Sequence, residues 1–208
     1  MLYNFLKRSI DISSSLVLII LFLPIWIIVP LLIILESRGP IFFLQERVGK
    51  DRRKFKIIKF RSMIIDADDY WKKNPNLHEK FKKLGWKLTL DEDPRITKLG
   101  RVLRQTSIDE FPQVFNILLG DMSFVGPRPY RFSEIYDAKK RYGKQIISSI
   151  DQSLTVKPGL TGYWQVSGRN DISWDKRDKM EAEYASRKNL LDDFAIIIKT
   201  PLAMVSKW

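Results

Sequence analysis

The residues best suited to chemistry are two adjacent carboxylates, Asp109 and Glu110, with Arg104 nearby. Paired carboxylates beside a cation can hold a divalent metal ion while one of them attacks a phosphorus atom. Ser107 offers a structural alternative, because serine followed three residues later by glutamate forms a capping box at a helix start. Pro112 weakens this alternative by disfavouring helical backbone just before it. Either interpretation places both acids near a helix N-terminus, where free N–H groups favour phosphate.

A second candidate is Arg128, which stands between Pro127 and Pro129. The two prolines restrict the backbone, so the guanidinium is presented at low entropic cost. A planar guanidinium held in this way suits the forked recognition of a diphosphate. A rigid surface turn is the alternative interpretation.

A third candidate is the glycine-rich segment 157–170, which contains Tyr163, Trp164 and Arg169. Its glycines would let the backbone approach a ligand closely, and its two aromatic rings offer stacking surfaces. Glycine-rich segments are also common as plain turns, so this pattern is weak by itself.

Composition limits the available chemistry. The 208 residues include no cysteine and a single histidine, His78, so catalysis must use carboxylates, hydroxyls, lysine or arginine. The formal net charge of +12 indicates an anionic partner, which would be nucleic acid, a phosphorylated small molecule or an acidic membrane surface.

One segment points to a membrane. Residues 12–35 carry no charged side chain, and as a helix they would extend roughly 36 Å, enough to cross a bilayer. Pro24 stands at the middle of this run, and basic residues flank both of its ends. Because cationic flanks favour the cytoplasmic side, a helix-break-helix hairpin that enters and leaves on one face fits better than a straight span. A kinked single span remains the alternative.

The remaining chain predicts short strands and several helices. Residues 41–44 and 55–61 read as a strand hairpin, with Lys59 and Arg61 on one face. Apolar spacing predicts a helix over 108–119 that stops at Gly120. Further helical segments are predicted at three places, namely 66–85 with a break at Pro75, the charged segment 176–188, and an apolar stripe over 190–198. Pro201 is expected to interrupt the helix that follows this stripe. That stripe suits either a core or a membrane interface.

Taken together and in this order, these segments resemble the monotopic polyprenyl-phosphate phosphoglycosyl transferases of the bacterial sugar transferase family. The resemblance runs over nearly the whole chain and includes the segments 7–11, 45–49, 59–63, 66–68 and 93–97. It implies a small α-rich α/β domain with a few short strands and amphipathic interfacial helices, plus an N-terminal re-entrant membrane helix hairpin broken at Pro24. Residues 1–36 would form the membrane-embedded part and residues 37–208 the cytoplasmic catalytic domain.

The resemblance also implies a mechanism. The aspartate matching Asp109 attacks the β-phosphorus of a UDP-sugar, UMP leaves, and the covalent aspartyl-phosphosugar is passed to a polyprenyl phosphate such as undecaprenyl phosphate. Glu110, together with Asp109, would bind Mg²⁺. Substrate binding would fall to five cationic side chains in the matching segments, namely Lys59, Arg61, Arg104, Arg128 and Arg169.

This reaction would be the first membrane step of bacterial polysaccharide or glycoconjugate synthesis, at the cytoplasmic face of the inner membrane. Inner-membrane lipid would be a further partner, and a homodimer is left open.

Two departures from the family stand out. Its aromatic-rich C-terminal stretch is replaced by the segment 184–191, and the large N-terminal membrane region of some members is absent, which indicates a minimal catalytic form. The segments 66–85, 93–97 and 162–169 look more like members that use galactose or glucose phosphates.

A function of another class, a membrane-tethered nucleic-acid-binding protein, would also account for the charge of +12 and the six tryptophans. It leaves the acid pair Asp109 and Glu110 and the proline-flanked Arg128 unexplained. We therefore expect no nucleic-acid partner. The sequence leaves the sugar and the polyprenyl chain length open.

Overall fold

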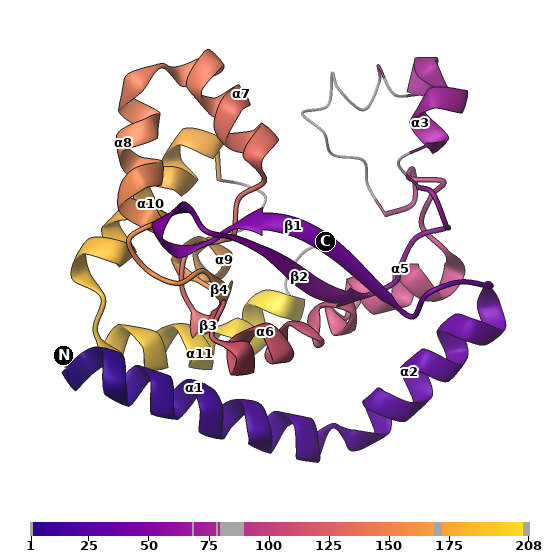
Figure 1. The fold of residues 1–208 in the computed structure, drawn as a ribbon, viewed down its shortest axis with the longest axis horizontal. Coiled ribbons are helices and arrows are strands. Elements are labelled where there is room, and N and C mark those ends of the chain that lie inside the picture. Colours follow the sequence, from indigo (N-terminus) through magenta and orange to yellow (C-terminus); the bar gives the residue numbers. More distant parts are fainter. Residues whose placement is uncertain (1, 68, 78, 80–89, 169–171, 206–208) are drawn as a thin grey trace. The chain divides into compact units, whose positions relative to one another are not determined.

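A computed structural model of the chain describes residues 2–67, 69–77, 79, 90–168 and 172–205 (Figure 1). Its residues cluster into two units. Unit 1 comprises Met1–Phe22, Leu44–Ile58 and Pro112–Lys207, and unit 2 comprises Leu23–Phe43 and Lys59–Phe111. The predicted site residue Arg169 and the single histidine, His78, lie outside the described residues.

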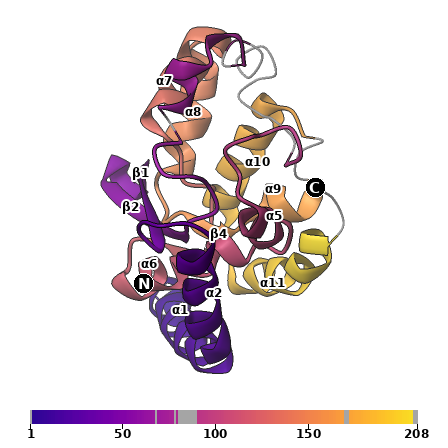
Figure 2. The same cartoon turned by 90° about the vertical axis from the view of Figure 1, so that its right-hand side faces the viewer.

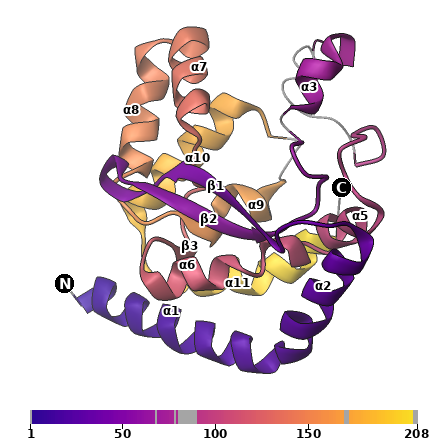
Figure 3. The same ribbon diagram turned by 45° about the vertical axis from the view of Figure 1, so that its right-hand side comes forward.

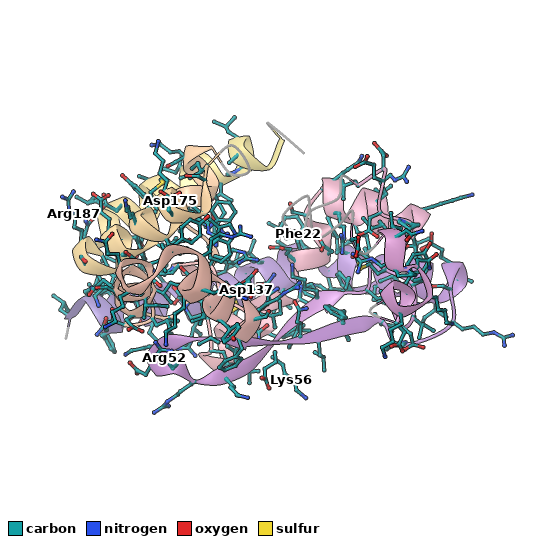
Figure 4. The ribbon with its side chains drawn as sticks, turned by 90° about the horizontal axis from the view of Figure 1, so that it is seen from above. Phe22, Arg52, Lys56, Asp137, Asp175 and Arg187 are labelled. Carbon is teal, nitrogen blue, oxygen red and sulfur yellow. The ribbon has the colours of Figure 1, made fainter. Side chains whose placement is uncertain are left out.

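The predicted strand hairpin is confirmed. Strands β1 (Phe42–Val48) and β2 (Lys54–Phe60) pair as a two-stranded sheet. Their connection contains the 3-10 turn η1 (Lys50–Arg52) and is too short for anything but antiparallel pairing. Alternation along β2 buries Ile57 and leaves the neighbouring Lys56 exposed, pointing outward from the strand (Figure 4).

The N-terminal run forms two helices, α1 (Leu2–Leu21) and α2 (Leu23–Glu36), with a bend of 64° at the break between them. Pro24 lies in the first turn of α2, where its missing N–H is best tolerated. It cannot donate to Ile20 four residues earlier, which explains why one helix does not continue into the next. Among the described helices none is long and apolar enough to cross a bilayer alone, but this bent pair meets that criterion together.

Unit 1 is mainly helical. Its helices after α1 are α6 (Gln113–Leu119), α7 (Phe132–Tyr142), α8 (Lys144–Ser153), α9 (Tyr163–Ser167), α10 (Trp174–Arg187) and α11 (Leu190–Val205). Helices α7 and α10 both pack against α8 (Figure 2). One apolar core of this unit comprises Val48, Tyr130, Ala138, Ile146, Ile150 and Leu154.

Helix α1 is fastened to the rest of unit 1 by charged side chains. It runs along α6 (Figure 3). The guanidinium of Arg8 donates to the carbonyl oxygens of Ile117 and Leu118, at the end of α6, at 2.5 and 2.7 Å; the Ile117 oxygen also accepts from the Gly120 N–H at 3.0 Å. Asp11 accepts from the Ser123 hydroxyl and the Phe124 N–H, both at 3.0 Å. A largely apolar helix is therefore held by a few specific polar contacts.

Three glycines of unit 1 pack backbone against backbone. The short strands β3 (Ser123–Val125) and β4 (Gly159–Thr161) pair in parallel, with Ser123 opposite Gly159. A Cβ atom at Gly126 would lie 2.4 Å from the Lys157 carbonyl oxygen, and one at Gly159 would lie 2.1 Å from the Gly126 nitrogen. Gly162 meets Gly126 in the same way. Gly159 and Gly162 of the segment 157–170 thus permit close chain packing with Gly126, and the predicted close approach of this segment to a ligand stays a prediction.

Unit 2 contains α2, α3 (Tyr70–Lys73), α5 (Lys98–Gln105) and the 3-10 turn η2 (Ile108–Glu110). Its core comprises Val29, Ile33, Phe60 and Leu103, so α2 and α5 share an apolar interface with the end of β2. Thr97 caps α5 by accepting from the Gly100 N–H at 2.9 Å. The break predicted at Pro75 is confirmed, since α3 ends at Lys73, but α3 begins only at Tyr70. Residues 68, 78 and 80–85 of the predicted helical segment 66–85 lie outside the described residues.

Three predicted features differ from the structure. The helix expected over residues 108–119 is split into η2 and α6, because a separate helix starts after Pro112, which is the N-cap of α6. The predicted stop at Gly120 is confirmed, since this residue ends α6 with a φ of 89°. The capping box at Ser107 is not formed, since this residue has a φ of 56° and makes no side-chain cap. Helix α11 continues through Pro201, so the predicted interruption there was wrong.

A buried glutamate of unit 1 gives a stability prediction. Glu181 on α10 has no exposed surface, and its Oε1 accepts from the Arg128 N–H at 3.0 Å. Burial raises its pKa to about 8. Its folded pKa thus lies above its unfolded pKa, so its contribution to stability is full below about pH 4.5 and is lost as pH rises to about 8.

We expect Glu181→Gln, which keeps an accepting oxygen, to become steadily more stable than the parent between pH 5 and pH 8, by roughly 1 kcal/mol per pH unit. Thermal unfolding across this range measures the difference. The exposed Glu183→Gln is the control. A stability difference between Glu181→Gln and the parent that does not change with pH would contradict the raised pKa of Glu181.

Candidate active site

The acid pair lies on the 3-10 turn η2 of unit 2. Asp109 is buried, with 6% of its surface exposed, while Glu110 is partly exposed. Burial raises the pKa of Asp109 to about 6; the charge of Lys59 opposes this rise and the Glu110 carboxylate adds to it. Asp109 is therefore a carboxylate of raised basicity that is still mainly ionised near pH 7.

Two cations of the same unit face this pair. The Lys59 Nζ, at the end of β2, lies 2.5 Å from Glu110 Oε1. Arg104 stands at the end of α5, which packs against η2, and its charge acts on Asp109. Burial lowers the pKa of Arg104, while the carboxylates of Asp109 and Asp93 act in the opposite direction. The structure thus gathers four of the predicted site residues around one turn.

The position of Arg104 depends on a tight contact between α5 and the chain after β2. Its Nε donates to the Ser62 hydroxyl at 2.9 Å. A Cβ atom at Gly100 would lie only 2.0 Å from the Ser62 carbonyl oxygen, so the helix can approach this closely only with glycine. The Thr97 N–H also donates to that carbonyl oxygen at 3.2 Å. Ser62 and Gly100 were not among the predicted site residues.

Arg61, a predicted substrate-binding residue, is buried and contacts the end of α2. Its guanidinium donates to the Arg38 carbonyl at 2.8 Å and to the Ser37 carbonyl and hydroxyl at 2.6 and 2.9 Å. These are the bonds of a helix C-terminal cap. In this structure Arg61 therefore fixes the chain after α2, and its substrate contact stays a prediction.

A second charged pair lies near Arg104 in unit 2. Arg95 donates through Nε and Nη2 to the two carboxylate oxygens of Asp93, at 2.8 and 2.6 Å, and both side chains are buried. Burial would raise the pKa of Asp93, but hydrogen bonds from Arg95 and the charges of Arg95 and Arg104 lower it. The sequence marked this segment only through the family resemblance.

The other predicted residues that the structure describes belong to unit 1. The Arg128 guanidinium forms a forked pair with Glu134, with both N–O distances 3.1 Å. Tyr163 and Trp164 lie on α9, and the Trp164 ring centroid is 5.5 Å from the Arg177 guanidinium. Arg177 also lies 3.9 Å from the centroid of Trp174. Trp164 thus stacks with a cation of its own chain.

The two carboxylates of η2 fit Mg²⁺ as a part of its ligand shell. Among the described residues there is no group of three or more side chains of the usual metal-binding types. Mg²⁺ commonly takes only one or two protein carboxylates and completes its shell with substrate phosphates and water. Asp109 and Glu110 meet that requirement jointly with a phosphorylated substrate.

A basic, buried carboxylate beside a second carboxylate, a lysine and an arginine is an arrangement suited to phosphoryl chemistry. The cations can neutralise phosphate oxygens, and the desolvated carboxylate can act as nucleophile. The geometry of unit 2 therefore defines a candidate site for group transfer at phosphorus.

Comparison with known proteins places the chain in a family. The model of the bacterial sugar transferase family matches residues 2–207, so the chain belongs to that family. An exopolysaccharide production protein ExoY from Sinorhizobium fredii is 38% identical over 202 residues, which cover 93% of this chain and 83% of that protein.

Two longer relatives carry more specific names. The UDP-galactose-lipid carrier transferase of Erwinia amylovora is 38% identical over 95% of this chain, and the undecaprenyl-phosphate galactose phosphotransferase of Salmonella typhimurium is 39% identical over the same share. The chain spans about 40% of the length of each of these two proteins.

The contact at Gly100 gives a prediction for the site. Glycine to alanine within a helix normally stabilises by roughly 1 kcal/mol. We expect Gly100→Ala to destabilise instead, by about 1–3 kcal/mol, because the added methyl group collides with Ser62. Lys98→Ala, on the exposed surface of the same helix, is the control. Chemical denaturation measures both, and a stabilised Gly100→Ala would show that α5 does not pack this closely.

Proposed function

We propose that this chain transfers a sugar 1-phosphate from a UDP-sugar to undecaprenyl phosphate and releases UMP. The observation that carries the proposal is the buried Asp109 beside Glu110, Lys59 and Arg104, in a chain that belongs to the bacterial sugar transferase family. The names of its relatives, which include an undecaprenyl-phosphate galactose phosphotransferase, support the choice of donor and acceptor.

The proposed reaction proceeds in two displacements. An Asp109 carboxylate oxygen attacks the β-phosphorus of the UDP-sugar, and the bond from that phosphorus to the bridging oxygen breaks, so UMP leaves with the electron pair. A phosphate oxygen of undecaprenyl phosphate then attacks the same phosphorus and displaces the Asp109 carboxylate. The raised pKa of Asp109 helps the first step, since a more basic carboxylate is a better nucleophile.

The neighbouring side chains would hold charge. Lys59 and Arg104 neutralise phosphate oxygens, and Arg128 and Arg169 are proposed as further phosphate-binding or nucleotide-binding residues. Glu110, with Asp109, would hold Mg²⁺. When bound, Mg²⁺ would offset charge on the diphosphate.

We further propose that residues 1–36 are embedded in the cytoplasmic leaflet of the bacterial inner membrane as a re-entrant hairpin, with residues 37–208 as the catalytic domain. The bent pair α1 and α2 supports this, as does its apolar surface. Helix α11 would lie at the interface, since Leu191, Ile198 and Leu202 are 73–81% exposed.

We propose galactose or glucose as the transferred sugar, and relatives named for galactose and for glucose support this choice. A relative in Aeromonas hydrophila is named for N-acetylgalactosamine, so the donor panel must include that sugar. The product would enter polysaccharide synthesis, in line with the relatives named for exopolysaccharide production.

Activity is tested by UMP release from UDP-galactose, UDP-glucose and UDP-N-acetylgalactosamine, with undecaprenyl phosphate and Mg²⁺. We expect one donor to be preferred and Asp109→Asn to lose at least about a thousandfold in rate, because an amide is no nucleophile. Glu110→Gln should require more Mg²⁺. The exposed Asp121→Asn is the matched control. Full activity of Asp109→Asn would contradict the proposal.

Topology is tested with single cysteines, since the chain has none of its own. We expect Asn4→Cys and Lys50→Cys, both at exposed positions, to resist a membrane-impermeant thiol reagent in intact cells and to react after permeabilisation. Both ends of the hairpin would then face the cytoplasm. Labelling at position 4 alone would indicate a straight span.

A further inference from the structure

Two cationic side chains of unit 1 meet beside Gly120, the residue that ends α6. Gly120 has a φ of 89°, and a Cβ atom there would lie 3.4 Å from the Lys157 Nζ and 3.6 Å from the Arg8 Nη2. Beyond the chain neighbours of Gly120, the next nearest atom is the Cζ of the same arginine, at 3.8 Å. The space that a side chain would fill at this position is therefore bordered first by two positive charges.

Lys157 is the less satisfied of the two cations. It is partly buried, and in the described parts of the chain its Nζ has no hydrogen bond or ion pair. Burial lowers the pKa of Lys157, and the charges of Arg8 and Lys50 lower it further. The more distant charges of Asp11 and Asp121 act in the opposite direction. Lys157 is thus a cation whose surroundings do not favour its charge.

The two acids near Lys157 do not neutralise it by direct contact. Asp11 is buried and accepts from the Ser123 hydroxyl and the Phe124 N–H, both at 3.0 Å. Asp121 is exposed. Within the residues that the structure describes, neither acid forms an ion pair with Lys157. An anion from outside the chain would therefore meet an unpaired ammonium group.

Arg8 is held in place by the protein. Its Nη1 and Nη2 donate to the carbonyl oxygens of Ile117 and Leu118. Each of these two nitrogens carries a second N–H, and Nη2 is the one nearest to Gly120. A fixed guanidinium beside a lysine ammonium group suits an anionic oxygen, because charge-assisted hydrogen bonds are stronger than neutral ones.

The position of Arg8 on α1 indicates where such an anion would come from. Apolar side chains of this helix on both sides of Arg8 are 49–71% exposed, namely Leu2, Phe5, Leu16 and Val17. In a helix that contacts lipid, arginine extends to the level of the headgroups. Lipid phosphate is then the anion that Arg8 and Lys157 meet most often.

We propose that Arg8 and Lys157 bind the phosphate group of an anionic phospholipid in the space beside Gly120. A phosphate oxygen at that place can accept from both cations, which offsets the repulsion between them. The inference rests on the membrane location of α1 that belongs to the proposed function. It adds a lipid site that is separate from the acid pair of unit 2.

The test is a titration of the purified 208-residue chain in neutral detergent with phosphatidylglycerol, read by native mass spectrometry. We expect the parent chain to bind this lipid at least about tenfold more tightly than zwitterionic phosphatidylcholine. Lys157→Gln should raise the Kd for phosphatidylglycerol roughly tenfold, because one charge-assisted hydrogen bond is lost. Lys140→Gln, which removes an exposed charge of α7, is the control and should change this Kd less than about twofold. Equal Kd values for the two variants would overturn the proposal.

Two further variants separate this site from positive charge in general. Lys157→Arg keeps a cation and should retain the affinity of the parent within about threefold. Gly120→Ala keeps both cations but places a methyl group in the proposed phosphate position, so it should weaken binding. Its positive φ strains alanine, and thermal unfolding checks that the variant is folded. Parent affinity in a folded Gly120→Ala would contradict the proposed position of the phosphate.

Inorganic phosphate and undecaprenyl phosphate identify the source of the anion. Inorganic phosphate at the concentration of the lipid should not displace phosphatidylglycerol, because it gains nothing from the apolar surface of α1. Displacement at that concentration would assign the site to free phosphate and overturn the proposal. Tighter binding of undecaprenyl phosphate than of phosphatidylglycerol, lost in Lys157→Gln, would overturn it in favour of the acceptor lipid.

UMP release by the same preparation of the parent chain tests the proposed function separately. UMP release without preferential binding of phosphatidylglycerol would overturn only the inference about Arg8 and Lys157. Binding that depends on Lys157, without UMP release from any donor of the panel, would support the inference and contradict the proposed reaction.

Discussion

An ionisable carboxylate buried beside a second carboxylate is the constraint on which the site in unit 2 depends. Asp109 is 6% exposed, and both its burial and the charge of Glu110 raise its pKa. Such a group is tolerated when cations nearby offset its charge. Lys59 supplies one charge from the end of β2, and Arg104 supplies another from the end of α5.

Apolar packing and a close backbone contact place these two cations beside Asp109. The apolar contacts of α2 and α5 with Phe60 set the end of β2 against both helices. Gly100 then allows α5 to approach the Ser62 carbonyl, and the Ser62 hydroxyl holds Arg104. The same fit that makes up the core of unit 2 therefore sets the electrostatics around Asp109.

Local patterns predicted much of this architecture. The apolar run 41–44, the charged turn around Gly49 and the segment 55–61 predicted the hairpin, Pro24 predicted the bend in the apolar run, and the charged segment before Lys188 predicted a helix. Residue type and spacing also selected the acid pair. Each of these signals lies within a few neighbouring residues, which is why sequence reasoning reaches them.

Long-range hydrogen bonds account for what sequence reasoning missed. The described hydrogen bonds of the Arg61 guanidinium reach the end of α2 and the chain just after it, more than twenty positions away, while its substrate contact stays a prediction. The role of Gly126 and Gly159 in chain packing depends on strand pairing across a similar separation. The Asp93–Arg95 pair and the Glu134 contact to Arg128 are closer in sequence, yet nothing in residue type distinguishes them from surface charges.

Intact-protein mass spectrometry can detect the covalent attachment of the phosphosugar to Asp109 that we propose. The protein is incubated with UDP-galactose, or the preferred donor, and Mg²⁺, without lipid acceptor. The proposed two-step mechanism predicts a mass increase equal to one sugar phosphate, mapped to Asp109, absent in Asp109→Asn and removed by undecaprenyl phosphate. Product formation with no adduct, together with intersecting double-reciprocal plots, would contradict it and indicate direct attack by the lipid phosphate.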